Sequence, residues 1–219
     1  MPTKRSIMKE IMKAIVFSDI HWLYPEFKAS DFPAADLAIF AGDWSGHGTK
    51  KETEKFAAWY SKLPCKEKFA VPGNHERYVF AYQEEAKSIF RDSGIKLLID
   101  EPAMIGGRKF WGSPWCPGFG DWSWAFLKNE QELGSCFSKI PQDTEILITH
   151  CPPAGILDHG YGSLALRYAL DNIHMLKLHI FGHIHSERGE ITLDGLRCIN
   201  ASVLDDDYKR QGGAIEIEI

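Results

Sequence analysis

The segment Ala14–His21 reads AIVFSDIH, an apolar run that ends in the polar pair Asp19 and His21. A short run rich in Val, Ile and Phe predicts a strand that is buried on both faces. The polar residues come directly after it, where such a strand is expected to end. Loops and ligands gather at the carboxyl ends of strands in an open α/β sheet. The segment therefore predicts a strand that delivers a carboxylate and an imidazole to a binding edge.

The same arrangement recurs four more times along the chain. Further strands are predicted at Leu37–Ala41, Phe69–Val71, Ile146–Thr149 and Leu178–Phe181. They are followed in turn by Gly42-Asp43, Gly73-Asn74-His75-Glu76, His150 and Gly182-His183-Ile184-His185. The glycines that precede three of these polar residues allow the backbone to turn tightly as each strand ends. Because the ends of such strands meet at one sheet edge, we expect a single site whose members span most of the chain.

Segments with helical periodicity lie between the predicted strands. Thr49 is expected to cap a helix that carries Phe56, with Glu52 completing a capping box. Two more helices are predicted at Tyr82–Asp92 and Leu164–Ile173. Strands that alternate with helices predict an α/β layering in which helices cover a central sheet.

Other strands carry more polar residues and are predicted to be half-solvated or edge strands. They are Arg108–Trp111, Glu190–Thr192, Leu196–Asn200 and Ala214–Ile219. We therefore expect a two-sheet mixed β-sandwich flanked by helices. No composition shift marks a linker, so residues 1–219 are interpreted as one domain.

Composition excludes several classes of function. The chain has 30 acidic and 25 basic residues, a net charge of -5, and no long basic run. Extended nucleic acid is therefore a poor candidate partner. The five cysteines show no C-x-x-C pair and are expected to be reduced thiols. The first dozen residues contain no apolar segment long enough for a signal peptide or membrane span, so we expect a cytoplasmic protein without membrane association.

The polar residues at the strand ends have the chemistry of a metal centre. Carboxylate, imidazole and amide oxygen suit divalent manganese, iron and zinc, and no cysteine is required. Two such cations about 4 Å apart need an anionic bridge, for which Asp43, in the middle of the set, is our choice. A water between them loses its proton near neutral pH, and the hydroxide is placed for in-line attack on phosphorus. Each motif alone has an ordinary turn or core interpretation, but the order of all five favours a site.

The five motifs resemble those of the calcineurin-like metallophosphoesterases over about residues 13–200. They are SDIH at 18–21, AGD at 41–43, PGNHE at 72–76, TH at 149–150 and GHIH at 182–185. The resemblance implies a first metal held by Asp19, His21, Asp43 and His185, and a second held by Asp43, Asn74, His150 and His183. It also implies that Asp43 bridges the two metals and that His75 faces the scissile phosphate as transition-state stabiliser or general acid.

A narrower resemblance concerns the substrate. The segments WGSPW at 111–115 and THCPPAG at 149–155 look like those of the metallophosphoesterase-domain proteins known from mammalian brain and their microbial relatives. That subfamily includes phosphodiesterases of simple diesters and cyclic nucleotides, which usually use manganese or related metals. Protein serine/threonine phosphatases carry Gly-Asp-x-x-Asp-Arg-Gly at the second motif, whereas this chain has GDWSGHG at 42–48. A small-molecule phosphodiester or nucleotide is therefore the expected substrate, and two manganese ions, with iron or zinc as alternatives, are the expected cofactors.

Several alternatives stay open. A phosphomonoesterase or a nuclease of the same fold is one, and a non-catalytic protein-binding scaffold is another. The aromatic segment Phe110–Phe126 is interpreted either as a lid that stacks a nucleobase or as core or a homodimer contact, with Trp115 as the residue to test. His47 and the loop around His159 are weaker candidates for substrate contact, and His179 is expected on the far face of its strand.

Overall fold

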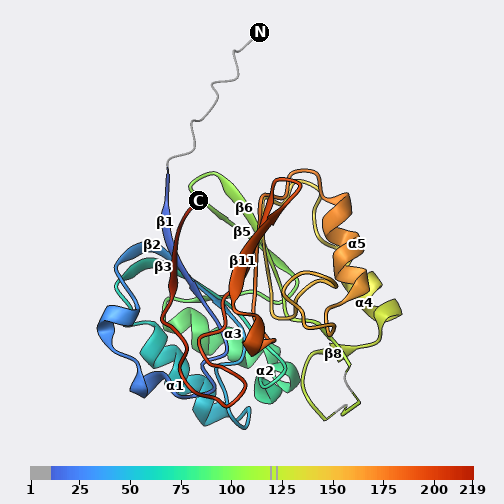
Figure 1. Cartoon of the computed structure of the whole chain (residues 1–219). Coiled ribbons are helices and arrows are strands. Elements are labelled where there is room, and N and C mark those ends of the chain that lie inside the picture. Colours follow the sequence, from blue (N-terminus) through green and yellow to red (C-terminus); the bar gives the residue numbers. More distant parts are fainter. Residues whose placement is uncertain (1–10, 119, 122) are drawn as a thin grey trace.

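Two mixed β-sheets face each other in the computed structural model, which describes residues 11–118, 120–121 and 123–219 (Figure 1). The first sheet has the order β13 (Ile215–Glu218), β1 (Lys13–Phe17), β2 (Ala35–Ala41), β3 (Cys65–Val71) and β4 (Lys96–Leu97). The second has the order β11 (Gly189–Leu193), β12 (Leu196–Asn200), β10 (Leu178–Phe181), β9 (Ile146–Thr149), β6 (Arg108–Ser113) and β5 (Glu101–Ile105). With helices outside both sheets, the predicted two-sheet α/β architecture is confirmed.

Strand direction brings the polar residues to one edge. Strands β1, β2, β3 and β4 run parallel, and so do β6, β9, β10 and β12; the antiparallel strands β13, β11 and β5 lie at sheet edges. The sheets are joined at their carboxyl ends, where the Ser18 N–H donates to Ala201 O at 3.0 Å and the Val203 N–H donates to Ser18 O at 3.1 Å. Loops from both sheets therefore converge on the same place.

Helices cover the outer faces of the sandwich. The first sheet is covered by α1 (Lys50–Tyr60), α2 (Arg77–Ala81) and α3 (Gln83–Asp92), and the second by α4 (Glu130–Phe137) and α5 (Leu164–Asn172) (Figure 1). The capping box of α1 forms as predicted, because Thr49 accepts from the Glu52 N–H and the Glu52 carboxylate accepts from the Thr49 N–H. Ser163 caps α5 by accepting from the Leu166 N–H at 3.1 Å. No helix of the described ranges is long and apolar enough to cross a membrane.

Of the four strands predicted to be half-solvated or at an edge, two lie inside the second sheet. β6 pairs with β5 and β9, and β12 pairs with β10 and β11. Each begins with half-buried residues, including Arg108 and Arg197, and ends fully buried at Ser113 and Asn200. The charged residues lie at the half-buried starts of the two strands, so the sequence of each strand resembles that of an edge strand. β5 and α4 were not predicted.

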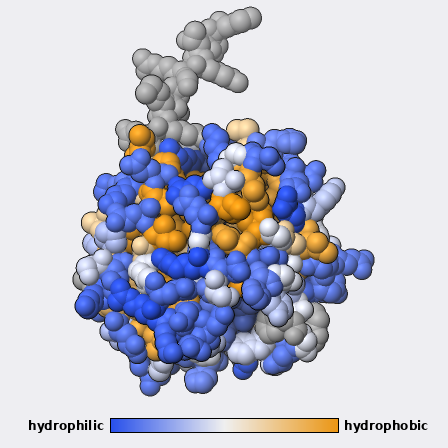
Figure 2. Space-filling view, in the orientation of Figure 1, coloured by the Kyte–Doolittle hydropathy of each residue, from blue (hydrophilic) through white to orange (hydrophobic). Residues whose placement is uncertain are grey.

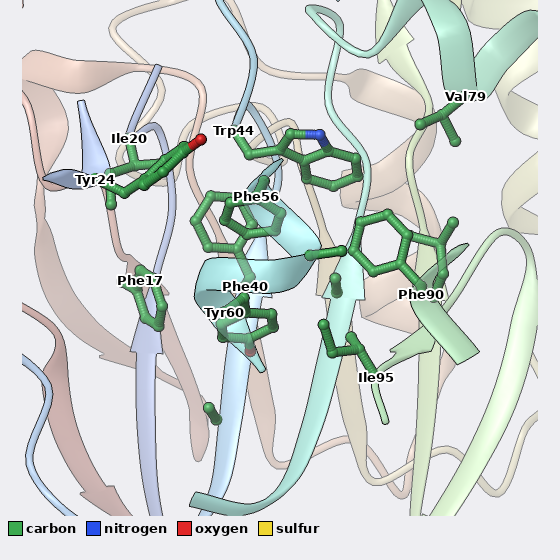
Figure 3. Packing of buried hydrophobic residues seen from close by; sticks show 14 of the residues in the cluster. Phe17, Ile20, Tyr24, Phe40, Trp44, Phe56, Tyr60, Val79, Phe90 and Ile95 are labelled. Carbon is green, nitrogen blue, oxygen red and sulfur yellow. The ribbon is translucent and has the colours of Figure 1, made fainter. Parts of the chain in front are cut away.

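The aromatic core under α1 holds the loop that follows β2. Trp44, which comes directly after Asp43, is fully buried and stacks on Phe56 with 5.0 Å between ring centroids and 6° between planes. Phe40 and Phe90 close around the same pair (Figure 3). Aromatic pairs of this kind contribute about 0.5–1.5 kcal/mol each beyond their buried area. Trp44 therefore anchors the backbone next to Asp43 in the core.

The space between the sheets is filled by a second apolar cluster. It reaches the surface at the amino ends of the parallel strands, where Met12, Ile105 and Ile219 are half-buried at its margin. Figure 2 shows apolar side chains gathered in this upper part of the face, above a mostly polar lower half. This apolar end is opposite to the edge at which the polar motif residues lie.

Candidate metal centre

All seven predicted ligands lie at the carboxyl edge of the sheets. β1 is followed by Asp19 and His21, β2 by Asp43, β3 by Asn74, β9 by His150, and β10 by His183 and His185. Three groups drawn from these residues and His75 have ligand atoms that all lie within 4.8 Å of one another: Asp19, His21 and His185; His21, Asp43 and His75; Asp19, Asp43 and His150. The tertiary structure thus brings residues from five strands into one cluster.

The backbone is strained where it presents several of these side chains. Asp19, His21, Asp43 and His183 have φ angles of 55°, 38°, 63° and 72°, in the left-handed region that non-glycine residues seldom occupy. Hydrogen bonds hold part of this conformation, since the Asp19 N–H donates to Gly42 O at 2.9 Å and the His21 N–H donates to Asp43 O at 3.1 Å. Such strain is typical of functional sites, where the surrounding structure maintains it.

The glycines of the motifs are needed mainly because side chains pack against them. A Cβ atom on Gly73 would lie 2.3 Å from Asp43 Oδ1, and one on Gly182 would lie 2.2 Å from Asp19 Oδ2. Gly42 is required both by its backbone conformation and by close packing, because its φ is 97° and a Cβ there would lie 2.3 Å from His150 Nδ1. The predicted tight turn therefore explains Gly42, whereas close approach of a carboxylate explains Gly73 and Gly182.

Asp19 is held by an unusually dense set of donors. Its Oδ2 accepts from the hydroxyls of Ser18 and Ser202, each at 2.6 Å, and both of its oxygens accept from the His183 N–H at 3.0–3.1 Å. Burial alone would raise the pKa of this carboxyl, but hydrogen bonding and the charge of His185 hold the pKa well below its usual range. Asp19 is therefore an ionised, rigidly oriented carboxylate.

His150 provides a test of whether a cation fits. Its Nδ1 lies 2.8 Å from Ala41 O and so carries the hydrogen, which leaves the Nε2 lone pair facing Asp43 Oδ2 at 3.2 Å and Asn74 Oδ1 at 3.1 Å. A lone pair that faces two oxygens needs a proton or a cation between them. Burial would lower the pKa of His150, but Asp43 raises it to about 10. The residues therefore fit a divalent cation at this point.

On the other side of the cluster, His185 also has one ring nitrogen bonded to the backbone and the other facing candidate ligands. Its Nδ1 lies 3.0 Å from Asp205 O, and its Nε2 lies 3.1 Å from His21 Nε2 and 3.6 Å from Asp19 Oδ1. Burial would lower the pKa of His185, but Asp19 raises it to about 9. Burial lowers the pKa of His21 to about 4, so its imidazole is neutral and can offer a lone pair.

Asp43 lies between the two halves of the cluster. Its Oδ2 is 3.2 Å from His150 Nε2 and 3.8 Å from both His21 Nε2 and His75 Nε2. Its Oδ1 accepts from the His75 N–H at 2.9 Å. Burial would raise the pKa of Asp43, but the surrounding histidines, His150 foremost, hold the pKa well below its usual range. This central position is the one that a bridging carboxylate requires.

His75 lies beside Asp43 and retains some exposure. Its Nδ1 is 3.1 Å from Gly46 O, so that nitrogen donates and Nε2 is left for another partner. Its side chain is 12% exposed, and its ring centroid lies 4.4 Å from that of Trp124. A histidine with one nitrogen tied to the backbone and the other directed at the site can act on a bound substrate.

Glu76, the last residue of the third motif, positions the loops and is not itself a candidate ligand. It is fully buried, and its carboxylate accepts from the N–H groups of Gly73 at 2.6 Å, Asp43 at 2.9 Å and Ser45 at 3.0 Å. Burial and the charge of Asp43 raise the pKa of Glu76 to about 8, against the opposing effect of these donors. Glu76 thereby ties the loop after β2 to the loop after β3.

Four residues near the cluster were not identified from the sequence. Ser202 orients Asp19, and Asp205 orients His185 through its carbonyl oxygen. Tyr208, with a φ of 58°, places its ring 4.9 Å from that of His21, and Arg77 places its guanidinium 4.6 Å from the ring of Trp124. None belongs to a recognisable pattern, although Arg77 adjoins the third motif.

The described residues of the aromatic segment lie in two different places, most of them in the core and one beside the cluster. Trp111 and Phe126 are buried, and Trp115 packs on Phe126 and donates from Nε1 to Asp100 at 2.8 Å, so these three belong to the framework. Trp124 alone among the described indoles lies against His75. Phe119 and Trp122 lie outside the described residues.

The other histidines lie outside the cluster. His179 is buried on the outer face of β10, 2.8 Å from Thr149 Oγ1, as predicted. His159 pairs with Glu187 at 3.3 Å, and His47 and His174 are exposed.

Comparison with known proteins identifies relatives of the whole arrangement. A family profile described as calcineurin-like phosphoesterase matches residues 12–187. Human metallophosphoesterase domain-containing protein 1 is 30% identical over 215 residues, covering 85% of this chain and 65% of the human protein. A UPF0046 protein of Caenorhabditis elegans is 31% identical over 207 residues, covering 87% of this chain and 69% of the worm protein. The chain thus spans about two thirds of the length of these relatives.

Solved structures share the fold at low sequence identity. The crystal structure of TT1561 of Thermus thermophilus superposes with a TM-score of 0.69 at 13% identity, covering 87% of this chain and 89% of that one. At this sequence identity the likeness shows a shared fold.

Proposed function

The chain belongs to the calcineurin-like phosphoesterase family, and from that premise we propose that it is a dinuclear metal-dependent phosphodiesterase. Asp19, His21, Asp43 and His185 would hold one cation, and Asp43, Asn74, His150 and His183 the other. The observation that carries the proposal is the position of Asp43, whose side chain belongs to two of the buried ligand groups at once. Carboxylate, imidazole and amide donors suit manganese, iron or zinc, of which we propose manganese.

When bound, two such cations polarise a phosphoryl oxygen and lower the pKa of the attacking water. The chain itself supplies orientation and proton transfer. Asp19 and Asp43 are fixed by backbone and hydroxyl donors, which orient both carboxylates before a metal binds. Backbone contact at Nδ1 aims His75 Nε2 toward the site, where it would stabilise the charge that develops on phosphorus or protonate the leaving oxygen.

The loop after β2 supports a diester rather than a monoester. A phosphomonoester dianion is commonly clamped by arginine, and residues 42–48 contain none. Trp44 and Ser45 are fully buried, and the N–H groups of Gly46 and His47 donate to Glu52 and not toward the site. A diester monoanion needs less positive charge, which suits a site with this loop.

Aromatic rings flanking the cluster support a substrate with a flat group. Trp124 lies beside His75, and Tyr208, with a half-exposed ring, lies beside His21 and His185. Stacking of a base on an aromatic side chain is worth about 1–3 kcal/mol. We therefore favour nucleotide diesters, cyclic nucleotides among them, as the substrate class.

The test compares hydrolysis of bis-p-nitrophenyl phosphate and p-nitrophenyl phosphate by protein stripped of metal and then resupplied with manganese. Metal content per chain is measured in the same samples. We expect two manganese ions per chain and faster turnover of the diester, lost on stripping. Faster turnover of the monoester would make the protein a phosphomonoesterase, and metal-loaded protein inactive on both would favour a scaffold.

A further inference from the structure

One thiol lies against the candidate metal centre that the ligand sets above do not use. Cys116 is fully buried in β7 (Cys116–Pro117), which pairs with β8 (Leu127–Lys128). Its Sγ and one ring nitrogen each of His150 and His183 all lie within 4.8 Å of one another. A sulfur and two imidazoles so placed form a metal-ligand group of their own.

We propose that Cys116 Sγ is an additional ligand of the cation held by His150 and His183. This inference rests on the proposed dinuclear site and makes its two positions chemically different. The first position would have only nitrogen and oxygen donors, whereas the second would include a thiolate. Thiolate ligands favour zinc and other softer cations over manganese and magnesium. The second position would therefore select zinc, even where the first accepts manganese.

The geometry allows coordination after a small movement. Zinc binds sulfur at about 2.3 Å and histidine nitrogen at about 2.0–2.1 Å, so adjacent ligands at angles of about 90–110° have sulfur and nitrogen roughly 3.1–3.6 Å apart. A separation of at most 4.8 Å can be closed by a movement of about 1–2 Å or less, shared between side chains. The Sγ contact to Pro114 O is 3.6 Å long and weak, and the thiol also contacts that of Cys151, so a turn of the sulfur toward a cation gives up only weak thiol hydrogen bonds.

The backbone of Cys116 is well placed for this role. Its N–H donates to Phe126 O at 2.9 Å, and Phe126 is itself fully buried. The ladder between β7 and β8 therefore fixes the Cα position while the side chain can still rotate about one bond. Coordination would replace the thiol proton by the metal, and that proton would leave to solvent.

Cys151 is a matched control. It follows His150 directly and is also fully buried, but its Sγ donates to Trp115 O at 3.1 Å. Cys151 belongs to none of the ligand groups found among the described residues. If removal of any buried thiol near His150 disturbs the site, both cysteine variants should show the effect. If the effect comes from loss of a metal ligand, only the Cys116 variant should show it.

The first measurement is the near-ultraviolet absorption of protein loaded with two equivalents of cobalt(II). A thiolate ligand produces a sulfur-to-cobalt charge-transfer band, which imidazole and carboxylate ligands do not. We expect the band in the wild type and in Cys151→Ala, and its loss in Cys116→Ser with two cobalt ions still bound. Absence of the band from the wild type, or its persistence in Cys116→Ser, would overturn the proposal.

A second measurement needs no variant. X-ray absorption of the wild-type protein with two zinc ions should show a sulfur scatterer at about 2.3 Å beside the nitrogen and oxygen shell at about 2.0–2.2 Å.

Competition between zinc and manganese tests the same ligand with a variant. Cys116→Ser should lose roughly tenfold or more of its zinc affinity and little of its manganese affinity, because loss of a residue that merely supports a metal ligand already costs about 10–100-fold in metal affinity. A shell without sulfur would refute the thiolate ligand, even in a protein with two metals and full diesterase activity. Failure to bind two metals would instead refute the dinuclear site.

Discussion

Replacement of Ser202 by alanine tests whether the hydroxyl that meets Asp19 stabilises the metal-free site. The Ser202 Oγ donates to Asp19 Oδ2 at 2.6 Å, and both residues are fully buried. A hydrogen bond to a charged group contributes about 1.5–3 kcal/mol, and 2.6 Å lies within the range of charge-assisted O–H···O⁻ bonds. Because Ser18 still donates to the same oxygen, we expect a loss of about 2 kcal/mol in the free energy of unfolding.

Ser45→Ala is the matched control. Ser45 is also fully buried, but its Oγ has no hydrogen-bond partner within the described part of the chain. Removing that hydroxyl should leave the free energy of unfolding almost unchanged. Urea unfolding of both variants and the wild type, without metal, measures the difference. Equal stability of the two variants would refute the assigned role of Ser202.

The pH dependence of the same variant gives an independent check. The folded pKa of Asp19 is depressed, so the stability contributed by its ionised form is present above the unfolded pKa, about 4, and is lost as pH falls through the lower folded value. The difference between Ser202→Ala and wild type should therefore stay constant from about pH 5 to pH 8. A difference that disappears within that window would show that Asp19 is not the acceptor that matters.

Three further substitutions test the site itself. His75→Ala should slow diester turnover by about 10²–10⁴-fold while both metals stay bound, because the imidazole would act on the substrate; loss of metal would assign it to the ligands. Asp43→Asn should reduce the measured occupancy of both metals together, and loss of only one would place the bridge elsewhere. Trp124→Ala should raise the Michaelis constant for nucleotide diesters by about five- to 150-fold, from the loss of about 1–3 kcal/mol of stacking. A small chromogenic diester is its control, and equal effects on both substrates would argue against stacking.

Much of the fold was predictable because it depends on local patterns. Short apolar runs predicted the five strands that end at polar motifs, and the Thr49 capping box predicted the start of α1. The interior positions of β6 and β12 could not be predicted, because strand order depends on pairing between distant segments. Their polar first residues resemble those of edge strands, yet both lie inside a sheet.

The sequence by itself determined which residues have metal-binding chemistry, because their types and their places after buried strands are local properties. Only the tertiary structure decided how they meet and what supports them. Ser202 reaches Asp19 across 183 residues, and the Cys116 sulfur reaches the imidazoles of His150 and His183 although no motif includes it. Such contacts follow from the joining of two sheets at their carboxyl ends, a long-range event that no spacing along the chain encodes.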